Sequence, residues 1–394
     1  MHYVDVILPL PLEGTFTYSV PESMVAQVRM GVRVLVPLGR SKTYTAMAVR
    51  LHSEKPEFET RPIIQVIDTE PVLIEQQLRL WQWISTYYMS PIGDVFKAAL
   101  PAGLKAEENY RPKTVRCVTL PANLRSEQSL HMALTILKRA LKQHQTFSTY
   151  LQLSHWSEID GETPPAHIAE IACDELQNAA NASDAVLRQL IQRNFLELYH
   201  REVGRLNTSG EYHPERIQPL SPAQQAAEDS IQKQFNEKNV VLLHGVTSSG
   251  KTEIYIHLIK KAIDEGKQVL YLLPEIALTV QMTRRLQNVF GSRLGIYHSK
   301  YSDAERVEIW KKQLSSEPYD VILGARSAVF LPFTRLGLVI VDEEHETSFK
   351  QQDPAPRYHA RSTAIMLARM YEGAKVLLGT ATPSMESYHN ACTG

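Results

Sequence analysis

Residues 244–252, His-Gly-Val-Thr-Ser-Ser-Gly-Lys-Thr, have the spacing G-x-x-x-x-G-K-[ST]. An apolar run at 240–243 precedes them and a helical pattern at 253–262 follows them, so the glycines form a turn between a strand and a helix. The backbone N–H groups of such a turn, together with the positive end of the helix dipole, bind phosphate oxygens. Lys251 is expected to reach the β- and γ-phosphates, and Thr252 to hold Mg²⁺. The expected nucleotide-binding residues of this loop are Gly245, Ser248, Ser249, Gly250, Lys251 and Thr252.

A second group of chemically capable residues is Asp342-Glu343-Glu344-His345, which follows the apolar run 336–341. Ligands of open α/β sheets bind at the carboxyl ends of the strands, so Asp342 is expected to face the nucleotide. An acid at this position binds Mg²⁺, and Glu343 is expected to orient and deprotonate the attacking water. Glu343, Asp342 and Lys251 are therefore the predicted catalytic residues. The alternative is that the acids cap a helix or lie in a solvated loop.

Another apolar run, at 375–379, ends in Thr380-Ala381-Thr382. Hydroxyl groups at the same sheet edge suit a relay that senses the γ-phosphate through hydrogen bonds to the acidic group. His345, Thr380 and Thr382 are the residues expected to couple nucleotide state to the rest of the protein. Threonine and serine also form ordinary turns at strand ends, which is the alternative here.

Aromatic and basic residues are interleaved in residues 349–361, which we call the aromatic-basic loop. Aromatic faces can stack on bases while Lys and Arg contact phosphates, which is how proteins bind single strands. The loop follows the acids directly, so strand binding there would be coupled to nucleotide hydrolysis. An ordinary solvated loop is the alternative. The residues expected to contact DNA are Phe349, Lys350, Arg357 and Tyr358.

The composition is that of a globular protein with several cores: 43% of the 394 residues are hydrophobic and 22% are charged. This length predicts two to four domains. A net charge of −1 excludes a uniformly basic nucleic-acid binder but not local basic patches. The three cysteines are scattered, which argues against a disulfide framework or zinc cluster. No membrane span or signal peptide is recognisable, so a cytoplasmic location is expected.

The hydrophobic pattern changes along the chain. Within an expected domain at 1–105, residues 1–50 show short alternating segments typical of a small antiparallel sheet, residues 63–67 add a strand and residues 74–88 a helix. Residues 112–205 are mainly helical, with helices expected at 132–141, 167–176 and 185–191. A strand-like run at 195–199 suggests a terminal β hairpin and a winged helix, with a helical spacer as the alternative. A linker at 206–219 leads to 220–394, where a parallel sheet is expected with strands at 239–244, 268–273, 319–324, 336–342 and 375–380.

In this order the motifs resemble those of superfamily 2 helicases, and more closely those of the PriA family of bacterial primosomal helicases. The matches are motif I at 245–252, motif Ia at 273–279, motif Ib at 324–330, motif II at 342–345, motif III at 378–384 and an adenine-reading glutamine at Gln224. The aromatic-basic loop is the most family-specific of them. The resemblance implies a RecA-like helicase lobe at 220–394.

The amino-terminal segments also resemble the PriA family's β-rich domain that captures the 3′ end of a leading strand. The resemblance implies a DNA-binding pocket formed by Phe16, Thr17, Tyr18, Gly39 and Arg61. One departure concerns Thr17, because relatives often carry an acid between the two aromatic residues. A carboxylate accepts a hydrogen bond from a 3′-hydroxyl more strongly than a threonine does.

The resemblance implies an ATP-dependent 3′-to-5′ DNA helicase that recognises stalled or branched replication forks and restarts replication by primosome assembly. The implied cofactors are ATP and Mg²⁺, with Zn²⁺ in the full-length protein on ligands that this chain lacks. The implied partners are forked DNA with a leading-strand 3′ end, single-stranded DNA, primosome proteins and single-stranded DNA-binding protein. A monomer associated with the bacterial nucleoid and not with a membrane is expected.

The chain stops at Gly394, after motif III, whereas the family continues into a zinc region and a second lobe. The second lobe supplies an arginine to the ATP site, so these residues alone are expected to bind DNA without unwinding it. Two other functions stay open at this stage. One is a structure-specific fork-binding and loading module with a secondary ATPase, and the other is a P-loop translocase on duplex DNA.

Overall fold

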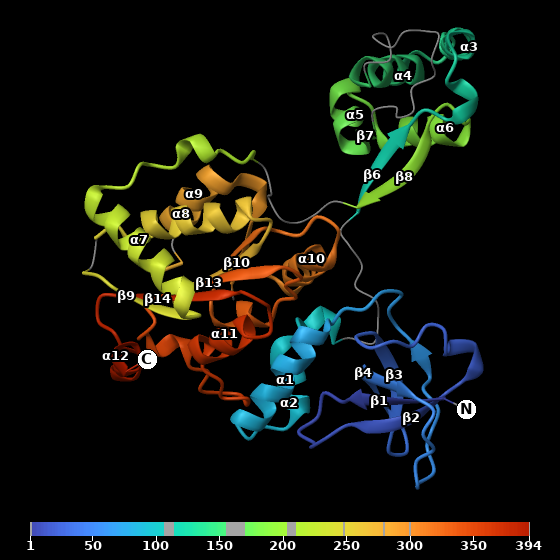
Figure 1. Ribbon diagram of the computed structural model, residues 1–394. Helices are drawn as coiled ribbons and strands as arrows, with labels where there is room; N and C mark the ends of the chain where they lie inside the picture. Colours follow the sequence, from blue (N-terminus) through green and yellow to red (C-terminus); the bar gives the residue numbers. More distant parts are fainter. Residues whose placement is uncertain are drawn as a thin grey trace. The chain divides into compact units, whose positions relative to one another are not determined.

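The computed structural model describes residues 2–105, 114–154, 170–202, 210–246, 249–278, 280–298 and 301–393. The chain forms two compact units, one made of residues 1–110 with 206–394 and the other of residues 111–205 (Figure 1). The first unit contains a five-stranded and a six-stranded sheet, and the second a three-stranded sheet.

The amino-terminal sheet is antiparallel, with strand order β2-β1-β4-β3-β5, which confirms the predicted small antiparallel sheet. Its strands are β1 (His2–Ile7), β2 (Phe16–Val20), β3 (Arg33–Leu38), β4 (Lys42–His52) and the short β5 (Gln65–Val66). Because successive side chains of a strand point to opposite faces, valines such as Val4 and Val34 lie in the core while polar neighbours face outward.

Two helices follow this sheet, α1 (Glu75–Tyr87) and α2 (Ile92–Ala99). The sequence pattern predicted α1 but not α2, which is short and begins directly after Pro91. Gly93 of α2 lies against the chain near Leu10, because a Cβ built on it would be 1.9 Å from the Leu10 carbonyl oxygen. The helix therefore needs glycine at this position to pack on the sheet domain.

The six-stranded sheet is parallel, with strand order β11-β12-β10-β13-β14-β9. Its strands are β9 (Val240–His244), β10 (Gln268–Leu272), β11 (Leu294–Tyr297), β12 (Val321–Gly324), β13 (Leu336–Asp342) and β14 (Lys375–Thr380). The five predicted strands are confirmed. The prediction missed β11, which is a four-residue edge strand with a glycine in it.

Helices cover both faces of this sheet, because parallel strands that alternate with helices along the chain place the helices on its faces. Helices α7 (Pro222–Glu237), α8 (Lys251–Asp264) and α9 (Val280–Phe290) pack on the face that contains Tyr271 and Ile340. Helices α10 (Asp303–Leu314) and α11 (Ala360–Ala368) pack on the opposite face, which contains Leu270 and Val339. A further helix, α12 (Met385–Thr393), follows β14.

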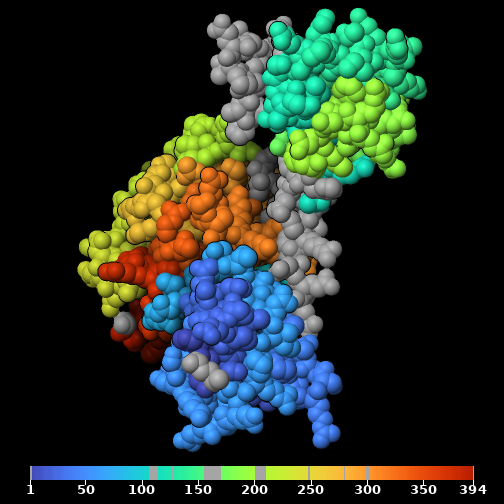
Figure 2. All heavy atoms as spheres, turned by 90° about the vertical axis from the view of Figure 1, so that its right-hand side faces the viewer, coloured from blue at the N-terminus to red at the C-terminus, as the bar shows by residue number. Residues whose placement is uncertain are grey.

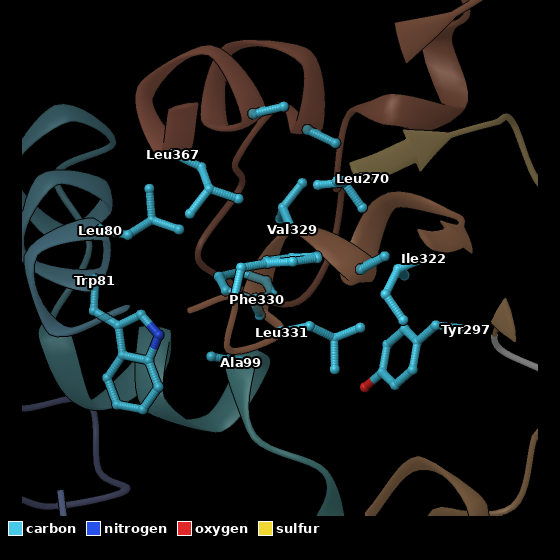
Figure 3. Packing of buried hydrophobic residues seen from close by; sticks show 14 of the residues in the cluster. Leu80, Trp81, Ala99, Leu270, Tyr297, Ile322, Val329, Phe330, Leu331 and Leu367 are labelled. Atoms are coloured by element: carbon cyan, nitrogen blue, oxygen red, sulfur yellow. The ribbon is translucent and has the colours of Figure 1, made fainter. Parts of the chain in front are cut away.

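The amino-terminal helices share a core with this second face. Leu80 and Trp81 of α1 belong to the same buried cluster as Phe330, Leu331 and Leu367 (Figure 3). Two side chains also cross the contact to backbone oxygens: Trp310 Nε1 donates to Val72 O at 2.7 Å, and Gln77 Nε2 donates to Phe330 O at 2.6 Å. Figure 2 shows the amino-terminal residues (blue) against the lobe (orange) in space-filling form.

The second unit contains helices α3 (Glu127–Leu137), α4 (Leu141–Leu153), α5 (Cys173–Ala180) and α6 (Asp184–Gln192). Its sheet has the order β7-β6-β8, with β6 at Thr114–Thr119, β7 at Ile171–Ala172 and β8 at Glu197–Glu202. The predicted helix at 132–141 therefore begins and ends earlier than expected, and that at 167–176 is described only from residue 170, its helical part starting at Cys173.

The terminal strand of this unit differs from the prediction. The predicted run at 195–199 overlaps β8 at residues 197–199, and β8 pairs antiparallel with β6 at the start of the unit, Thr114 opposite Glu202. Among the described residues, the partner of β8 is thus a strand distant in the sequence and not the adjacent strand of a hairpin. Strand β6 was not predicted, since residues from 112 onward were interpreted as helical.

Within the described ranges, no helix is long and apolar enough to cross a membrane.

Candidate nucleotide- and DNA-binding sites

The described residues of the loop after β9 show features of a phosphate-binding turn. Gly250 has φ +79°, a conformation in which glycine is favoured, and α8 begins at the next residue, Lys251. The Lys251 side chain is 8% exposed and its Nζ donates to Gly245 O at 3.0 Å, so the amine lies over the loop. Gly245 is also tied to β14, because its N–H donates to Thr380 O at 3.0 Å. Ser249 is described, whereas Ser248 lies outside the described residues.

Gln224 contacts this loop from the start of α7. Its Oε1 accepts a bond from Ser221 N at 2.8 Å, and its Nε2 donates to Gly250 O at 3.2 Å. A Cβ at Gly250 would lie 2.2 Å from Gln224 Nε2, so the glycine also makes room for the glutamine. The structure brings Gln224 to the nucleotide loop, and its reading of adenine remains a prediction.

Asp342 and Glu343 lie at the carboxyl end of β13, beside β14. The Asp342 carboxylate accepts bonds from the Tyr255 hydroxyl at 3.0 Å and the Tyr271 hydroxyl at 3.3 Å. Burial raises the pKa of Asp342, and the hydrogen bond from Tyr255 opposes that rise. Glu343 has φ +49°, a strained conformation for a residue with a Cβ. Strain of this kind concentrates at functional sites.

The donor set at this edge fits a magnesium ion. Mg²⁺ prefers oxygen ligands and is usually held by one or two carboxylates together with substrate phosphates. Asp342 offers a carboxylate at the tip of β13, and Thr252 offers a hydroxyl in the first turn of α8. These two residues would hold the ion, which would neutralise charge on the phosphates when bound.

The three predicted coupling residues lie in hydrogen-bond contact with one another. Nδ1 of His345 is 2.7 Å from the Thr380 hydroxyl, and Nε2 is 3.3 Å from the Thr382 hydroxyl. Thr382 N also donates to the Thr380 hydroxyl oxygen at 3.1 Å. The threonines are thus hydrogen-bonded to His345, and the role of these contacts in coupling remains a prediction.

Sequence analysis gave no role to Glu344 or Arg361, yet the structure buries them as an ion pair. Arg361 donates to the Glu344 carboxylate at 2.7 Å, and Ser384 N and the Ser387 hydroxyl donate to the same carboxylate at 2.7 and 2.8 Å. Burial acts against ionisation here, but these bonds and the Arg361 charge hold the pKa of Glu344 below its usual value. Glu344 therefore connects the acidic motif to α11 and to the segment after β14. The connection spans long sequence separations, so no local pattern indicates it.

The aromatic residues of the aromatic-basic loop are not placed as expected. Phe349 and Tyr358 are each 1% exposed, and the Tyr358 ring packs edge to face on Phe330 with centroids 5.0 Å apart. Their faces are covered, so the expectation that they stack on bases does not fit this structure. Arg357 is exposed, while the Lys350 amine lies 5.1 Å from the centre of the Tyr88 ring and donates to Arg357 O.

The aromatic-basic loop contains internal hydrogen bonds and is also hydrogen-bonded to the residue that follows α1. Gln351 N donates to Tyr358 O at 2.9 Å, and the Gln351 amide donates to Pro354 O and Pro356 O inside the loop. His359 N donates to the Tyr88 hydroxyl at 3.1 Å. Apolar aromatic side chains in a closed loop can serve packing as well as stacking, which is why composition alone did not separate the two.

His359 gives this region a pH dependence. Burial, and then the charges of Arg361 and Lys350, lower the pKa of His359 from 6.5 to about 4, although Glu386 and Glu344 act in the opposite sense. The unfolded chain therefore binds this proton first, so the contribution to stability is complete above pH 6.5 and is lost as the pH falls toward 4. We expect His359→Gln to reduce the loss of melting temperature between pH 7 and pH 5, measured by thermal unfolding at constant ionic strength.

The matched control for this change is His389→Gln, because His389 is exposed on α12. It should leave the wild-type pH dependence as it is. An unchanged pH dependence of the melting temperature in His359→Gln would show that His359 does not cause the loss of stability at low pH.

The predicted DNA pocket at the amino terminus is brought together in part. The Tyr18 hydroxyl donates to Pro37 O at 3.0 Å, and the Arg61 guanidinium donates to Gly39 O at 2.5 Å. Phe16 is half-buried and Tyr18 is buried, whereas Arg61 and Gly39 are exposed.

Thr17 points to the opposite face of β2 from Tyr18, as alternate strand residues do. Its hydroxyl donates at 2.7 Å to Asp5, the residue paired with it on β1. Asp5 also accepts from Arg50 at 3.1 Å. Sequence analysis missed this carboxylate, although it lies on the neighbouring strand in direct register with Thr17.

Three family models match successive parts of the chain. The 3′ DNA-binding domain of PriA matches residues 5–101, the winged helix domain of the PriA helicase from Bacteroidota matches 115–203, and the DEAD/DEAH box helicase matches 221–391. The winged-helix prediction is thereby confirmed. The fold and the family matches define a helicase domain of the DEAD/DEAH box class, attached to a 3′ DNA-binding domain and a winged helix domain.

Two relatives match this chain along its whole length. The replication restart protein PriA of Bacillus subtilis (strain 168) is 31% identical over 100% of this chain and 55% of its own length. The protein of the same name from Haemophilus influenzae is 34% identical over 100% of this chain and 51% of its own length. The chain belongs to the PriA family of replication restart proteins, and it spans about half the length of these relatives.

Among solved structures, the Hef helicase domain of Pyrococcus furiosus is 20% identical and covers 46% of this chain and 38% of its own, with a TM-score of 0.35. A similarity at this level supports no functional statement.

Proposed function

We propose that this chain binds ATP and the 3′ ends of DNA at stalled or branched replication forks, as part of an ATP-dependent 3′-to-5′ helicase that restarts replication. The observation that carries the proposal is the meeting of three motifs at one sheet edge. The loop at Gly245 is bonded to Thr380, Thr380 to His345, and the acids follow β13 beside the same strand.

Each residue at this edge has a role that its geometry supports. Lys251 exchanges its bonds to the loop carbonyls for bonds to the nucleotide phosphates, because a buried ammonium favours the ligand with the higher negative charge. Asp342 and Thr252 hold the magnesium ion, and Glu343 orients the attacking water and accepts its proton. His345 and its two threonine partners transmit the state of the γ-phosphate.

DNA binding is proposed at two places in the first unit. The amino-terminal pocket around Phe16, Tyr18, Gly39 and Arg61 takes a 3′-terminal nucleotide, with Thr17 on the opposite face of β2, and exposed Arg357 contacts a strand phosphate. Primosome proteins and single-stranded DNA-binding protein are the proposed protein partners. The proposed setting is a monomer at the bacterial nucleoid.

The DNA proposal is tested with fork substrates. A polypeptide of residues 1–394 should bind a fork with a 3′-hydroxyl at the branch more tightly than the same fork with a 3′-phosphate or a blunt duplex, measured by fluorescence anisotropy at fixed salt. Arg61→Ala should reduce that preference by roughly 10-fold to 100-fold, since one hydrogen bond to a charged group is worth about 1.5–3 kcal/mol.

Arg79→Ala is the matched control, because Arg79 is exposed on α1 and is not in the pocket. Equal affinity for all three substrates would contradict end recognition. The same polypeptide should show no ATP-dependent strand separation, because among the described residues one parallel sheet is present and the proposed motor uses two lobes. Measured unwinding would refute that part of the proposal.

A further inference from the structure

Two buried tyrosines from different elements contact the carboxylate of Asp342. Tyr255 of α8 donates to Oδ1 at 3.0 Å, and Tyr271 of β10 donates to Oδ2 at 3.3 Å. Both tyrosines are 0% exposed, and their rings meet edge to face with centroids 5.6 Å apart. The backbone N–H of Glu343 adds a bond to Oδ1 at 3.1 Å. Each carboxylate oxygen of Asp342 is thus held by a hydroxyl donor from a different element.

The two hydroxyl groups act as donors and not as acceptors. An ionised carboxylate has no proton to donate, so the hydroxyl group supplies the proton in each of these bonds. A charge-assisted bond of this kind is stronger than one between neutral groups.

The neighbouring strand is shaped around the Tyr255 hydroxyl. Gly379 of β14 lies opposite Asp342 in the sheet register. A Cβ on Gly379 would be 1.8 Å from the Tyr255 hydroxyl oxygen and 3.3 Å from Asp342 Oδ1. Tyr255 is 0% exposed, so its ring is enclosed by other atoms. Gly379 therefore serves this contact, which gives a physical reason for a glycine in the third motif.

The position of Tyr255 on α8 links it to the other proposed magnesium ligand. Tyr255 follows Thr252 by three residues, so the two side chains share one face of the helix. Through Tyr255 and Tyr271, helix α8 and strand β10 are both hydrogen-bonded to the Asp342 carboxylate at the end of β13.

We propose that Tyr255 and Tyr271 are positioning residues that hold the Asp342 carboxylate in one orientation toward a divalent cation, and that Gly379 is the space that the Tyr255 hydroxyl requires. This inference rests on the proposed function, in which Asp342 holds Mg²⁺ beside a nucleotide. It assigns to two tyrosines a role in cation affinity that is separate from phosphate binding by Lys251.

The test uses residues 1–394 and a fluorescent, non-hydrolysable ATP analogue, titrated with Mg²⁺. Tyr255→Phe and Tyr271→Phe, singly and together, remove the hydroxyl groups and keep the rings. The Mg²⁺ concentration that half-saturates the metal-dependent binding should rise by about 10- to 100-fold in the double variant, the usual effect of losing groups that orient a metal ligand. Binding of the analogue in EDTA should stay as in the wild type.

Tyr371→Phe is the matched control, because the Tyr371 hydroxyl is bonded to Phe333 O at 2.6 Å in the same unit and is not bonded to Asp342. It should leave the Mg²⁺ dependence unchanged. Gly379→Ala provides a second test: it should raise the Mg²⁺ requirement in the wild type and do so less in Tyr255→Phe, which lacks the oxygen that the new methyl would meet.

The outcomes separate the inference from the proposed function. A double variant with the wild-type Mg²⁺ dependence would overturn the inference while the nucleotide site stands. A wild-type protein that binds the analogue equally with and without Mg²⁺, or not at all, would overturn the proposed cation site itself.

Discussion

Lys251→Ala is expected to abolish ATP hydrolysis in any form of the protein that turns over ATP, while leaving DNA binding intact. The Lys251 amine lies over the loop within reach of the Gly245 oxygen, in the place where phosphates would bind. Removing one preorganised charge donor from a developing negative charge generally costs about 10²–10³ in rate. Hydrolysis would be followed by phosphate release, and DNA binding by anisotropy with the same preparation.

The control is Lys261→Ala in the last turn of the same helix, where the lysine contacts Gln232 on the surface. Its hydrolysis rate should match the wild type. Hydrolysis retained by Lys251→Ala would remove the phosphate loop from the mechanism. Loss of DNA binding in the same variant would show that the change had disturbed the fold and not the chemistry alone.

Tyr358→Ala and Phe349→Ala are expected to act first on stability. Both side chains are buried, and Tyr358 packs on Phe330 beneath the contact with α1. Truncating a buried aromatic side chain to alanine typically costs about 3–5 kcal/mol, because it removes apolar contacts and leaves a cavity. Unfolding in denaturant, monitored by circular dichroism, should show a clear shift of the midpoint for each variant.

Arg357→Ala is the matched variant in the same loop, because Arg357 is exposed. It should leave the unfolding midpoint unchanged and lower the affinity for single-stranded DNA. If Tyr358→Ala were as stable as the wild type and lost DNA binding, the aromatic rings would be base-stacking groups and their burial would describe only one conformation of the loop.

Much of the helicase lobe could be predicted from the sequence, because its information is local. A parallel strand buried on both faces is a run of Val, Ile and Leu, as in β13, and the motif residues follow directly after such runs. The spacing of residues 245–252 predicts a nucleotide site without reference to the fold. Strand β11 was missed since four residues with a glycine give no usable period.

The contacts that orient the site could not be predicted in the same way. Tyr255 and Tyr271 look like ordinary core residues on a helix and a strand, and only the fold brings their hydroxyl groups to Asp342. Glu344 and Arg361 are 17 residues apart, and no helical or strand periodicity predicts that their side chains meet. Asp5 and Thr17 are opposite one another only because β1 and β2 pair in that register.

The aromatic-basic loop shows the limit of composition. The pattern of Phe349, Lys350, Arg357 and Tyr358 is the same whether the rings face solvent or the interior. Burial separates the two, and burial here depends on Phe330 and on α1, which is more than 200 residues away in the sequence. The exposure of Arg357 was expected from the sequence, whereas the burial of the Phe349 and Tyr358 rings was not.

The contact between Gly379 and the Tyr255 hydroxyl also limits how this sequence can change by descent. A side chain at residue 379 would place its Cβ too close to the Tyr255 hydroxyl oxygen. The same substitution after Tyr255 has become phenylalanine would meet no hydroxyl group there. The order of the two mutations therefore matters, and the pair is accessible mainly along one route. Substitutions at these two residues, 124 positions apart on α8 and in the third motif, are therefore expected to depend on each other.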